Sequence, residues 1–231
     1  GTYSSAEAQN QILVKDVNGI KIAFLAFTYG TNGIPVPKDN SYCVNTPLDE
    51  ELILNQISLA KEQNPDLICA SMHWGNEYQL IPNDTQKDLA DLLFQNGVDL
   101  IFGSHPHVLQ PMEKRTVTLE DGTTKDCFVI YSLGNFISGQ TKDNTRNSVI
   151  LDIDITKNGE TDETTIDAVS YIPIYMYKSA SGSIRRYKLL DIEKSIANYD
   201  SGADTSIGSS TYSTLQKELS KIRKTMGENI N

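Results

Sequence analysis

Residues 66–107 read DLICASMHWGNEYQLIPNDTQKDLADLLFQNGVDLIFGSHPH, and this stretch decides the fold of the chain. Its first seven residues, 66–72, form an apolar run that predicts a buried strand. Residues 82–95 begin with Pro-Asn and carry leucines at helical spacing, which predicts an amphipathic helix. Gly97 suits the left-handed residue that ends such a helix. Residues 98–102 then form a second apolar run. The stretch is therefore a strand-helix-strand unit with parallel strands.

The same pattern continues on both sides of this unit. Residues 20–27 (IKIAFLAF) form an apolar run before it, and residues 127–133 (CFVIYSL) form one after it. The run Thr-Pro-Leu-Asp at 46–49 predicts a helix start, with Thr46 as the cap and an end near Gln63. The order strand-helix-strand-helix-strand predicts an α/β fold, in which helices cover a parallel sheet.

The pattern changes from residue 149 onward. Three alternating segments, VILDIDI, IDAVSYIPIYMY and RRYKLLDI, predict antiparallel strands of a second sheet. Residues 201–213 are rich in Ser, Gly and Thr and predict a loop, and residues 214–226 predict a terminal helix. We therefore expect one domain over residues 1–200, followed by a linker and terminal helix over residues 201–231.

The three histidines of the chain, His73, His105 and His107, each follow the carboxyl end of a predicted strand. We expect His73 and His105 at neighbouring strand ends, at the edge where open α/β sheets bind ligands. Pro106 favours extended backbone before it, in which His105 and His107 point the same way. Because imidazole nitrogen is a common ligand of Zn, Mn and Fe, the pattern predicts a metal site. The alternative is a chance cluster of hydrogen-bonded histidines.

The composition excludes several classes of function. A net charge of −10 repels a polyphosphate backbone, so we expect no binding to nucleic acid. An acidic polymer meets the same repulsion unless metal ions supply positive charge. The chain has no run of about 18 apolar residues, so no membrane span is predicted, and no signal peptide is visible. Gly1 in place of an initiator Met indicates that the chain begins inside a longer protein.

Three blocks of sequence carry a resemblance to a known family. They are MHWGNEY at 72–78, GSHPHVLQ at 103–110 and YSLGNF at 131–136. With these blocks the chain resembles the C-terminal portion of CapA-family proteins, which serve bacterial capsule and poly-γ-glutamate biosynthesis. The resemblance is close over residues 18–140 and loose beyond them.

The CapA family is similar to calcineurin-like metallophosphoesterases, which hold two metals between two packed sheets. The resemblance implies that this chain forms a portion of a metallophosphoesterase-like sandwich. It also implies that His73 and His105 serve one divalent metal and His107 the other, with Mn, Zn or Fe as the ions. Two such cations neutralise phosphate oxygens and generate hydroxide near neutral pH.

Other residues of the three blocks are candidates for the same site. We expect Glu77 and His107 to take part in catalysis, with Glu77 as acid, base or partner of a metal ligand. Asn135, Trp74 and Tyr78 are candidates for binding substrate, and Asn135 is also placed to orient a histidine. Each has an alternative interpretation: a solvated carboxylate for Glu77, a turn residue for Asn135, and packing for Trp74 and Tyr78.

The chain departs from the family pattern in one respect. It lacks the Gly-Asp block and the Asn-Asn-His block that supply the family with further ligands, and Ser104 stands where many relatives have another histidine. The resemblance thus implies that this chain carries about half of the site, is inactive alone, and pairs with its own N-terminal segment. It implies an extracytoplasmic protein, at the cell surface or attached to the membrane through that segment.

Three functions follow from these observations. The first is a metal-dependent hydrolase, when full length, of a phosphoester or an amide-linked polymer. The second is a non-catalytic assembly or anchoring protein for an acidic capsular polymer, working with its biosynthetic membrane complex. The third is a structural domain that pairs with its own N-terminal half and leaves a sheet edge exposed when isolated.

Overall fold

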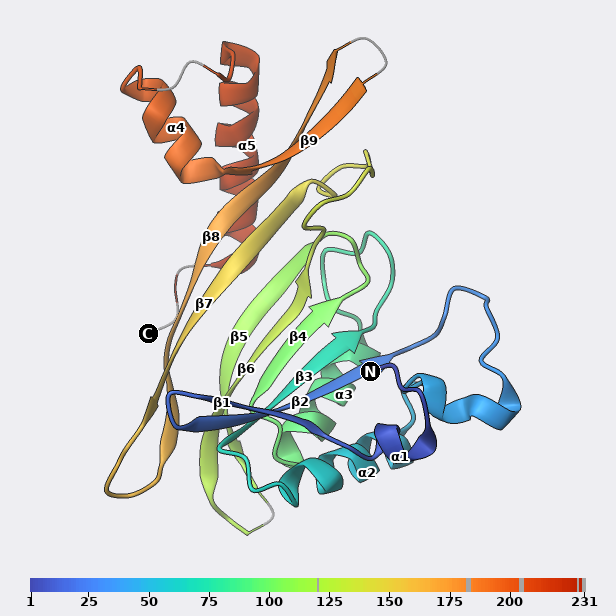
Figure 1. Ribbon diagram of the computed structural model, residues 1–231. Helices are drawn as coiled ribbons and strands as arrows, with labels where there is room; N and C mark the ends of the chain where they lie inside the picture. The colour runs from blue at the N-terminus through green and yellow to red at the C-terminus, as the bar shows by residue number, and fades with distance from the viewer. Residues whose placement is uncertain (120, 182–183, 204–205, 228, 230–231) are drawn as a thin grey trace.

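The computed structural model describes residues 1–119, 121–181, 184–203, 206–227 and 229 of the chain (Figure 1). In these residues a main sheet has six strands, in the order β1-β2-β3-β4-β6-β5. The four central strands run parallel, whereas β1 and β5 lie antiparallel at the two edges. The strands are β1 (Leu13–Val17), β2 (Ile20–Thr28), β3 (Leu67–His73), β4 (Leu100–Ser104), β5 (Leu109–Thr118) and β6 (Thr124–Leu133).

Two helices, α2 (Glu50–Lys61) and α3 (Asp84–Gln95), connect the parallel strands and cover one face of the main sheet. Ile57 of α2 and Phe94 of α3 belong there to one buried cluster with Ala23 and Leu25 of β2. Burial of a large apolar side chain contributes about 1.5–3 kcal/mol, so this layer stabilises the parallel order. The α/β fold predicted from the sequence is confirmed. A short helix α1 (Ala6–Gln9) and a 3₁₀ segment η1 (Lys38–Cys43) lie outside this layer.

The helix ends show which polar residues act as caps. The Asp49 carboxylate accepts a hydrogen bond from the Leu52 amide, so Asp49 caps α2 and the expectation of Thr46 as the cap is wrong. An aspartate one residue before the helix reaches the free amides directly, whereas Thr46 lies too far upstream. Asn83 caps α3 in a reciprocal capping box with Gln86. Gly97 follows with a φ of 96°, as predicted.

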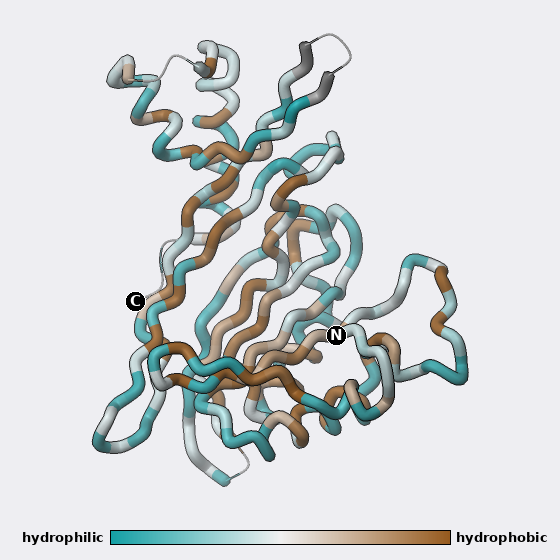
Figure 2. Tube along the Cα trace, in the orientation of Figure 1, coloured by the Kyte–Doolittle hydropathy of each residue, from teal (hydrophilic) through white to brown (hydrophobic). Residues whose placement is uncertain are grey.

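The second sheet is antiparallel, as predicted, and its strand order is β7-β8-β9. Its strands are β7 (Asn147–Lys157), β8 (Thr164–Ser181) and β9 (Ile184–Asp191). Val149 and Val169 of this sheet share a buried cluster with Phe128 and Ile130 of the main sheet. The second sheet therefore packs on the face opposite α2 and α3. Figure 2 shows the apolar segments gathered along the strands of the main sheet.

Two helices at the end of the chain pack on the sheets, the first on the second sheet and the second on both the second sheet and β5 of the main sheet. They are α4 (Ile192–Asp200), which the sequence did not predict, and α5 (Ser209–Met226). Helix α5 begins five residues before the expected start at Thr214, and Tyr212 in its first turn stacks on Tyr199 of α4 with ring centroids 4.4 Å apart. Of the predicted linker and terminal helix, residues 204–205, 228 and 230–231 lie outside the described residues.

Candidate metal centre

The three histidine rings converge at the carboxyl edge of the main sheet. His73 is the last residue of β3 and pairs in register with Ser104, the last residue of β4, so His105 follows at the same edge. The ring centroids of His73 and His105 are 4.8 Å apart, and those of His105 and His107 are 6.1 Å apart. The predicted convergence is confirmed. We call His73, His105 and His107 the histidine rim.

The backbone of the rim differs from the expected extended geometry. His105 has a φ of 98° and His107 a φ of 60°, in the left-handed region that residues with side chains rarely adopt. The Pro106 carbonyl accepts a hydrogen bond of 2.8 Å from the Tyr78 amide, which helps to hold this turn. The planes of the two rings are tilted by 52° to each other. Such strained residues persist where the surrounding structure holds them, commonly at functional sites.

Ser104 orients the His73 ring. The Ser104 hydroxyl donates to the Met72 carbonyl at 3.3 Å, and its oxygen lies 3.2 Å from Nδ1 of His73. Because that hydroxyl proton is already used, the Ser104 oxygen accepts from His73 Nδ1–H. Nε2 of His73 is therefore left with a free lone pair, which is the form that binds a metal.

Asn135 orients the His107 ring in a similar way. Its side-chain NH₂ donates to the Thr145 carbonyl at 3.1 Å and to Gln140 Oε1 at 3.3 Å, which fixes Oδ1 toward the ring. Oδ1 lies 2.9 Å from Nδ1 of His107 and accepts its proton. The free Nε2 of His107 is 3.8 Å from Oε1 of Glu77. Of the two roles that the sequence suggested for Asn135 at this site, the contacts correspond to orienting a histidine.

Two tyrosines flank the rim. Tyr78 stacks on His107 with ring centroids 6.0 Å apart, so it lies beside the site as expected. Tyr29, which the sequence analysis did not single out, lies 4.5 Å from the His105 ring and 5.8 Å from the His73 ring. It follows the carboxyl end of β2 just as the histidines follow β3 and β4, and its amide donates to the His73 carbonyl at 2.9 Å. The position of Tyr29 directly after a predicted strand was the sequence signal that could have identified it as a site residue.

Trp74 does not line the site. Its side chain is 1% exposed and belongs to the core between the main sheet and α3, where its Nε1–H donates to the Tyr131 carbonyl at 2.9 Å. The pocket-wall interpretation of Trp74 is therefore wrong and the packing alternative describes its position. Side chains alternate along an extended chain, so Trp74 faces the core with Met72 while His73 faces the rim.

The environment of the rim favours neutral imidazoles. Burial lowers the pKa of His73, and the neighbouring His105 and His107 lower it further. Burial also lowers the pKa of His105, with a contribution from His107 that Glu77 partly opposes. Neutral rings with a free nitrogen suit a divalent transition metal. They form a partial ligand set, because within the described residues no group of three or more His, Cys, Asp or Glu side chains is arranged to hold a metal ion.

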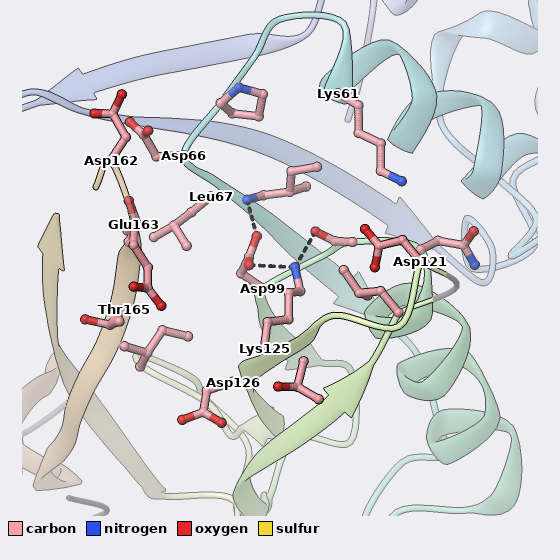
Figure 3. A pocket seen from close by; sticks show the side chains of 18 of the residues that line it. Lys61, Asp66, Leu67, Asp99, Asp121, Lys125, Asp126, Asp162, Glu163 and Thr165 are labelled. Atoms are coloured by element: carbon pink, nitrogen blue, oxygen red, sulfur yellow. Dashed lines mark hydrogen bonds and ion pairs between the residues drawn. The ribbon is translucent and has the colours of Figure 1, made fainter. Parts of the chain in front are cut away.

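A pocket of about 940 Å³ lies at the opposite edge of the main sheet, around the amino ends of β3 and β4 (Figure 3). Its charged side chains are largely paired: Asp99 lies 2.7 Å from the Lys125 ammonium, and Asp66 lies 2.9 Å from the Lys157 ammonium. The Asp99 carboxylate also accepts from the Ile68 amide at 2.7 Å. These contacts tie strand ends together, so we interpret the pocket as structural.

Among the described residues, no helix combines the length and the apolar composition needed to cross a membrane.

Two solved structures show a distant likeness to this chain. One is a sulfate thiohydrolase SoxB from Thermus thermophilus, with a TM-score of 0.37, 15% identity, and coverage of 78% of this chain and 24% of that one. The other is a hypothetical protein, also from Thermus thermophilus, with a TM-score of 0.36, 11% identity, and coverage of 78% of this chain and 61% of that one. Scores at this level do not assign a fold.

Two curated proteins show closer similarity. The PGA biosynthesis protein CapA of Bacillus subtilis (strain 168) is 38% identical over 157 residues, which is 68% of this chain and 38% of that protein. The capsule biosynthesis protein CapA of Bacillus anthracis is 33% identical over 152 residues, which is 64% of this chain and 34% of that protein. The chain thus spans little more than a third of the length of these relatives.

The family comparison covers the part of the chain that carries the rim. A family model described as bacterial capsule synthesis protein PGA_cap matches residues 1–140, which include β1 to β6 and all three histidines. The resemblance drawn from the three sequence blocks is confirmed. With more than half of its length matched, the chain belongs to this family of bacterial capsule synthesis proteins.

Proposed function

We propose that this chain belongs to a metal-dependent hydrolase that acts in the biosynthesis of an acidic capsular polymer. The observation that carries the proposal is the convergence of three imidazoles at one edge of the main sheet, with ring centroids 4.8 and 6.1 Å apart. The names of the two curated relatives, a PGA biosynthesis protein and a capsule biosynthesis protein, support the choice of polymer.

The proposed metal ligands are Nε2 of His73 and a ring nitrogen of His105 for one divalent ion, and Nε2 of His107 for a second. Mn, Zn or Fe suits these nitrogens. When bound, such an ion polarises the reacting oxygen and lowers the pKa of a bound water. Further ligands would come from a segment outside these residues, since the chain spans 38% and 34% of its relatives.

The remaining side chains position the reacting groups. Ser104 and Asn135 hold the Nδ1 protons of His73 and His107, which keeps each Nε2 directed to the site. Glu77 lies 3.8 Å from His107 and is 50% exposed, so its carboxylate can take a proton from an attacking water and return it to solvent. Tyr78 provides an aromatic wall beside His107 for the substrate.

The proposal extends to the location of the protein. A hydrolase that trims or releases a capsular polymer would work where that polymer emerges. We therefore propose an extracytoplasmic protein at the cell surface, in contact with the polymer and its biosynthetic membrane complex.

Hydrolysis by the full-length natural polypeptide that contains this chain tests the function. We expect Mn²⁺- or Zn²⁺-dependent cleavage of a chromogenic phosphodiester or of a γ-linked glutamate polymer. The His73→Ala/His105→Ala/His107→Ala variant should lose this activity while keeping its circular dichroism spectrum. Equal cleavage by both proteins, or none by the wild type with any of the metals, contradicts the hydrolase proposal.

A second candidate is a non-catalytic assembly or anchoring protein for the same polymer. The observation in its favour is that the described residues hold no ready-made group of three His, Cys, Asp or Glu ligands. Under this proposal the full-length protein binds the polymer without cleaving it. Retention of polymer on the immobilised protein, with no shortening of the polymer over hours in the presence of metal, supports the second candidate over the first.

A further inference from the structure

We infer that Lys142, together with the Tyr78 ring beneath it, forms a carboxylate-binding subsite beside the histidine rim. This inference rests on the proposed function only in taking an acidic polymer as the ligand. Lys142 lies in the segment between β6 and β7, and its ammonium is 3.6 Å from the centroid of the Tyr78 ring. Tyr78 in turn stacks on His107. The Tyr78 ring therefore contacts both the Lys142 ammonium and the histidine rim.

The Lys142 backbone is anchored to the site. Its carbonyl accepts hydrogen bonds from the Thr145 hydroxyl at 2.7 Å and from the Thr145 amide at 3.2 Å. Thr145 is fully buried, and its own carbonyl accepts from the side-chain NH₂ of Asn135 at 3.1 Å. Asn135 binds His107 through Oδ1. A continuous chain of hydrogen bonds therefore fixes the base of the Lys142 side chain relative to the imidazole.

The Lys142 ammonium retains its capacity to bind an anion. None of the ion pairs within the described part of the chain uses Lys142, and its side chain is exposed. The cation–π contact holds the ammonium over the ring without neutralising its charge. The ammonium has three N–H donors, and they cannot all point at the ring face at once. At least one donor therefore remains for an oxygen ligand.

The charge of the protein explains why such a residue is needed. A chain with a net charge of −10 repels an acidic polymer, and Glu77 adds a negative charge beside His107. Lys142 places a positive charge next to the rim, where it attracts one negative group of the polymer. A single ammonium matches a singly charged carboxylate, whereas recognition of a phosphate dianion commonly uses a guanidinium fork or several cations. The subsite is therefore assigned to carboxylate side groups.

Binding of a fluorescent γ-linked glutamate oligomer, measured by anisotropy in EDTA, tests the inference independently of metal and of hydrolysis. We expect Lys142→Gln to weaken binding about 5-fold, the size of effect that a solvent-exposed charge pair gives. Lys142→Arg, which keeps the charge, should bind within about 2-fold of the wild type. Raised salt should reduce the difference between wild type and Lys142→Gln.

Lys15→Gln is the matched control. Lys15 is an exposed lysine of β1 that pairs in register with Ile22, near the start of β2 and so at the opposite edge of the main sheet. We expect it to bind the oligomer as the wild type does. A γ-linked glutamine oligomer, which is uncharged, should not distinguish Lys142→Gln from the wild type.

The inference is overturned if the wild type does not bind the glutamate oligomer, if Lys142→Gln binds it equally, or if Lys15→Gln weakens binding as much. Preferential, Lys142-dependent binding of inorganic polyphosphate also overturns the assignment to carboxylate. Because these measurements need no metal, they separate the two proposals. If Lys142→Gln loses binding but the full-length protein hydrolyses nothing, the carboxylate subsite is supported and the hydrolase proposal is contradicted.

Discussion

Asn135 Oδ1 lies 2.9 Å from Nδ1 of His107, although the two residues are 28 positions apart in the chain. The contact joins the end of β6 to the turn after β4, two strands that are neighbours in the main sheet. It fixes which nitrogen of His107 carries the proton. Such outer hydrogen bonds commonly decide how well a histidine binds a metal.

Replacing Asn135 with alanine should therefore weaken metal binding at the rim. Without Oδ1, the Nδ1 proton has no fixed acceptor and the His107 ring is free to rotate. We expect roughly a 10-fold loss of Zn²⁺ affinity, measured by competition with a chromogenic chelator. Asn55→Ala, an exposed position on α2, is the control and should bind as the wild type does. An unchanged affinity in Asn135→Ala would show that Asn135 has no part in the site.

The single tryptophan reports on its place in the core. Trp74 is 1% exposed, so its fluorescence emission should be blue-shifted relative to the unfolded chain and poorly quenched by acrylamide. Because its ring faces the core, addition of a glutamate oligomer should leave this quenching unchanged. If the oligomer strongly reduced the quenching of Trp74 fluorescence by acrylamide, the result would support the pocket-wall interpretation of Trp74.

Gly103 in β4 lies where the neighbouring strand leaves no room for a side chain. A Cβ at this position would lie 1.9 Å from the Tyr131 carbonyl oxygen and 2.7 Å from Nε1 of Trp74. Gly103→Ala should lower the free energy of unfolding by about 3 kcal/mol, because the neighbouring backbone has to shift. Gly159→Ala, where nothing lies within 4 Å of the added Cβ, is the control and should change stability little. Urea denaturation of both variants measures the difference, and equal stabilities would contradict the packing described for β4 and β6.

The rim makes the metal-free protein sensitive to acid. Burial and neighbouring histidines lower the pKa of His73 and His105 below the ordinary value of 6.5, so the unfolded chain binds more protons than the folded one as pH falls through that value. The free energy of unfolding should thus decrease as pH is lowered from about 6.5. The stability that the neutral rings contribute is present above this pH.

Urea denaturation in EDTA at a series of pH values measures this dependence. His73→Gln/His105→Gln removes both titrating rings and should show a shallower decline in stability between about pH 7 and pH 5 than the wild type. Parallel declines in the two proteins would mean that carboxylates, and not the rim, cause the acid sensitivity.

Much of the fold follows from short-range patterns in the sequence. The apolar runs at 20–27, 66–72, 98–102 and 127–133 correspond to the four parallel strands, because parallel strands that are covered on both faces read as nearly continuous apolar runs. Of the four, β2 is the partly covered one, with Phe24 exposed. The edge strand β5 was missed because it carries Pro111 and mixes polar with apolar residues. An edge strand tolerates both features, since one side makes no strand pairing and part of its surface meets solvent.

The candidate site was predictable in position but not in detail. The topology of parallel strands brings His73 and His105 to one edge, so their proximity followed from the order of elements. The positive φ values of His105 and His107 did not follow, because local patterns do not contain long-range contacts such as the hydrogen bond from the Tyr78 amide to the Pro106 carbonyl. The place of Lys142 over Tyr78 depends likewise on Thr145 and Asn135, and no sequence period contains that information.

The central claim is that His73 and His105 bind one divalent metal and His107 a second, and isothermal titration of the full-length natural polypeptide that contains this chain with Zn²⁺ and with Mn²⁺ tests it most directly. We predict saturable binding by the wild type and its loss in the folded His73→Ala/His105→Ala/His107→Ala variant. Heats that do not differ between the two proteins would contradict the claim.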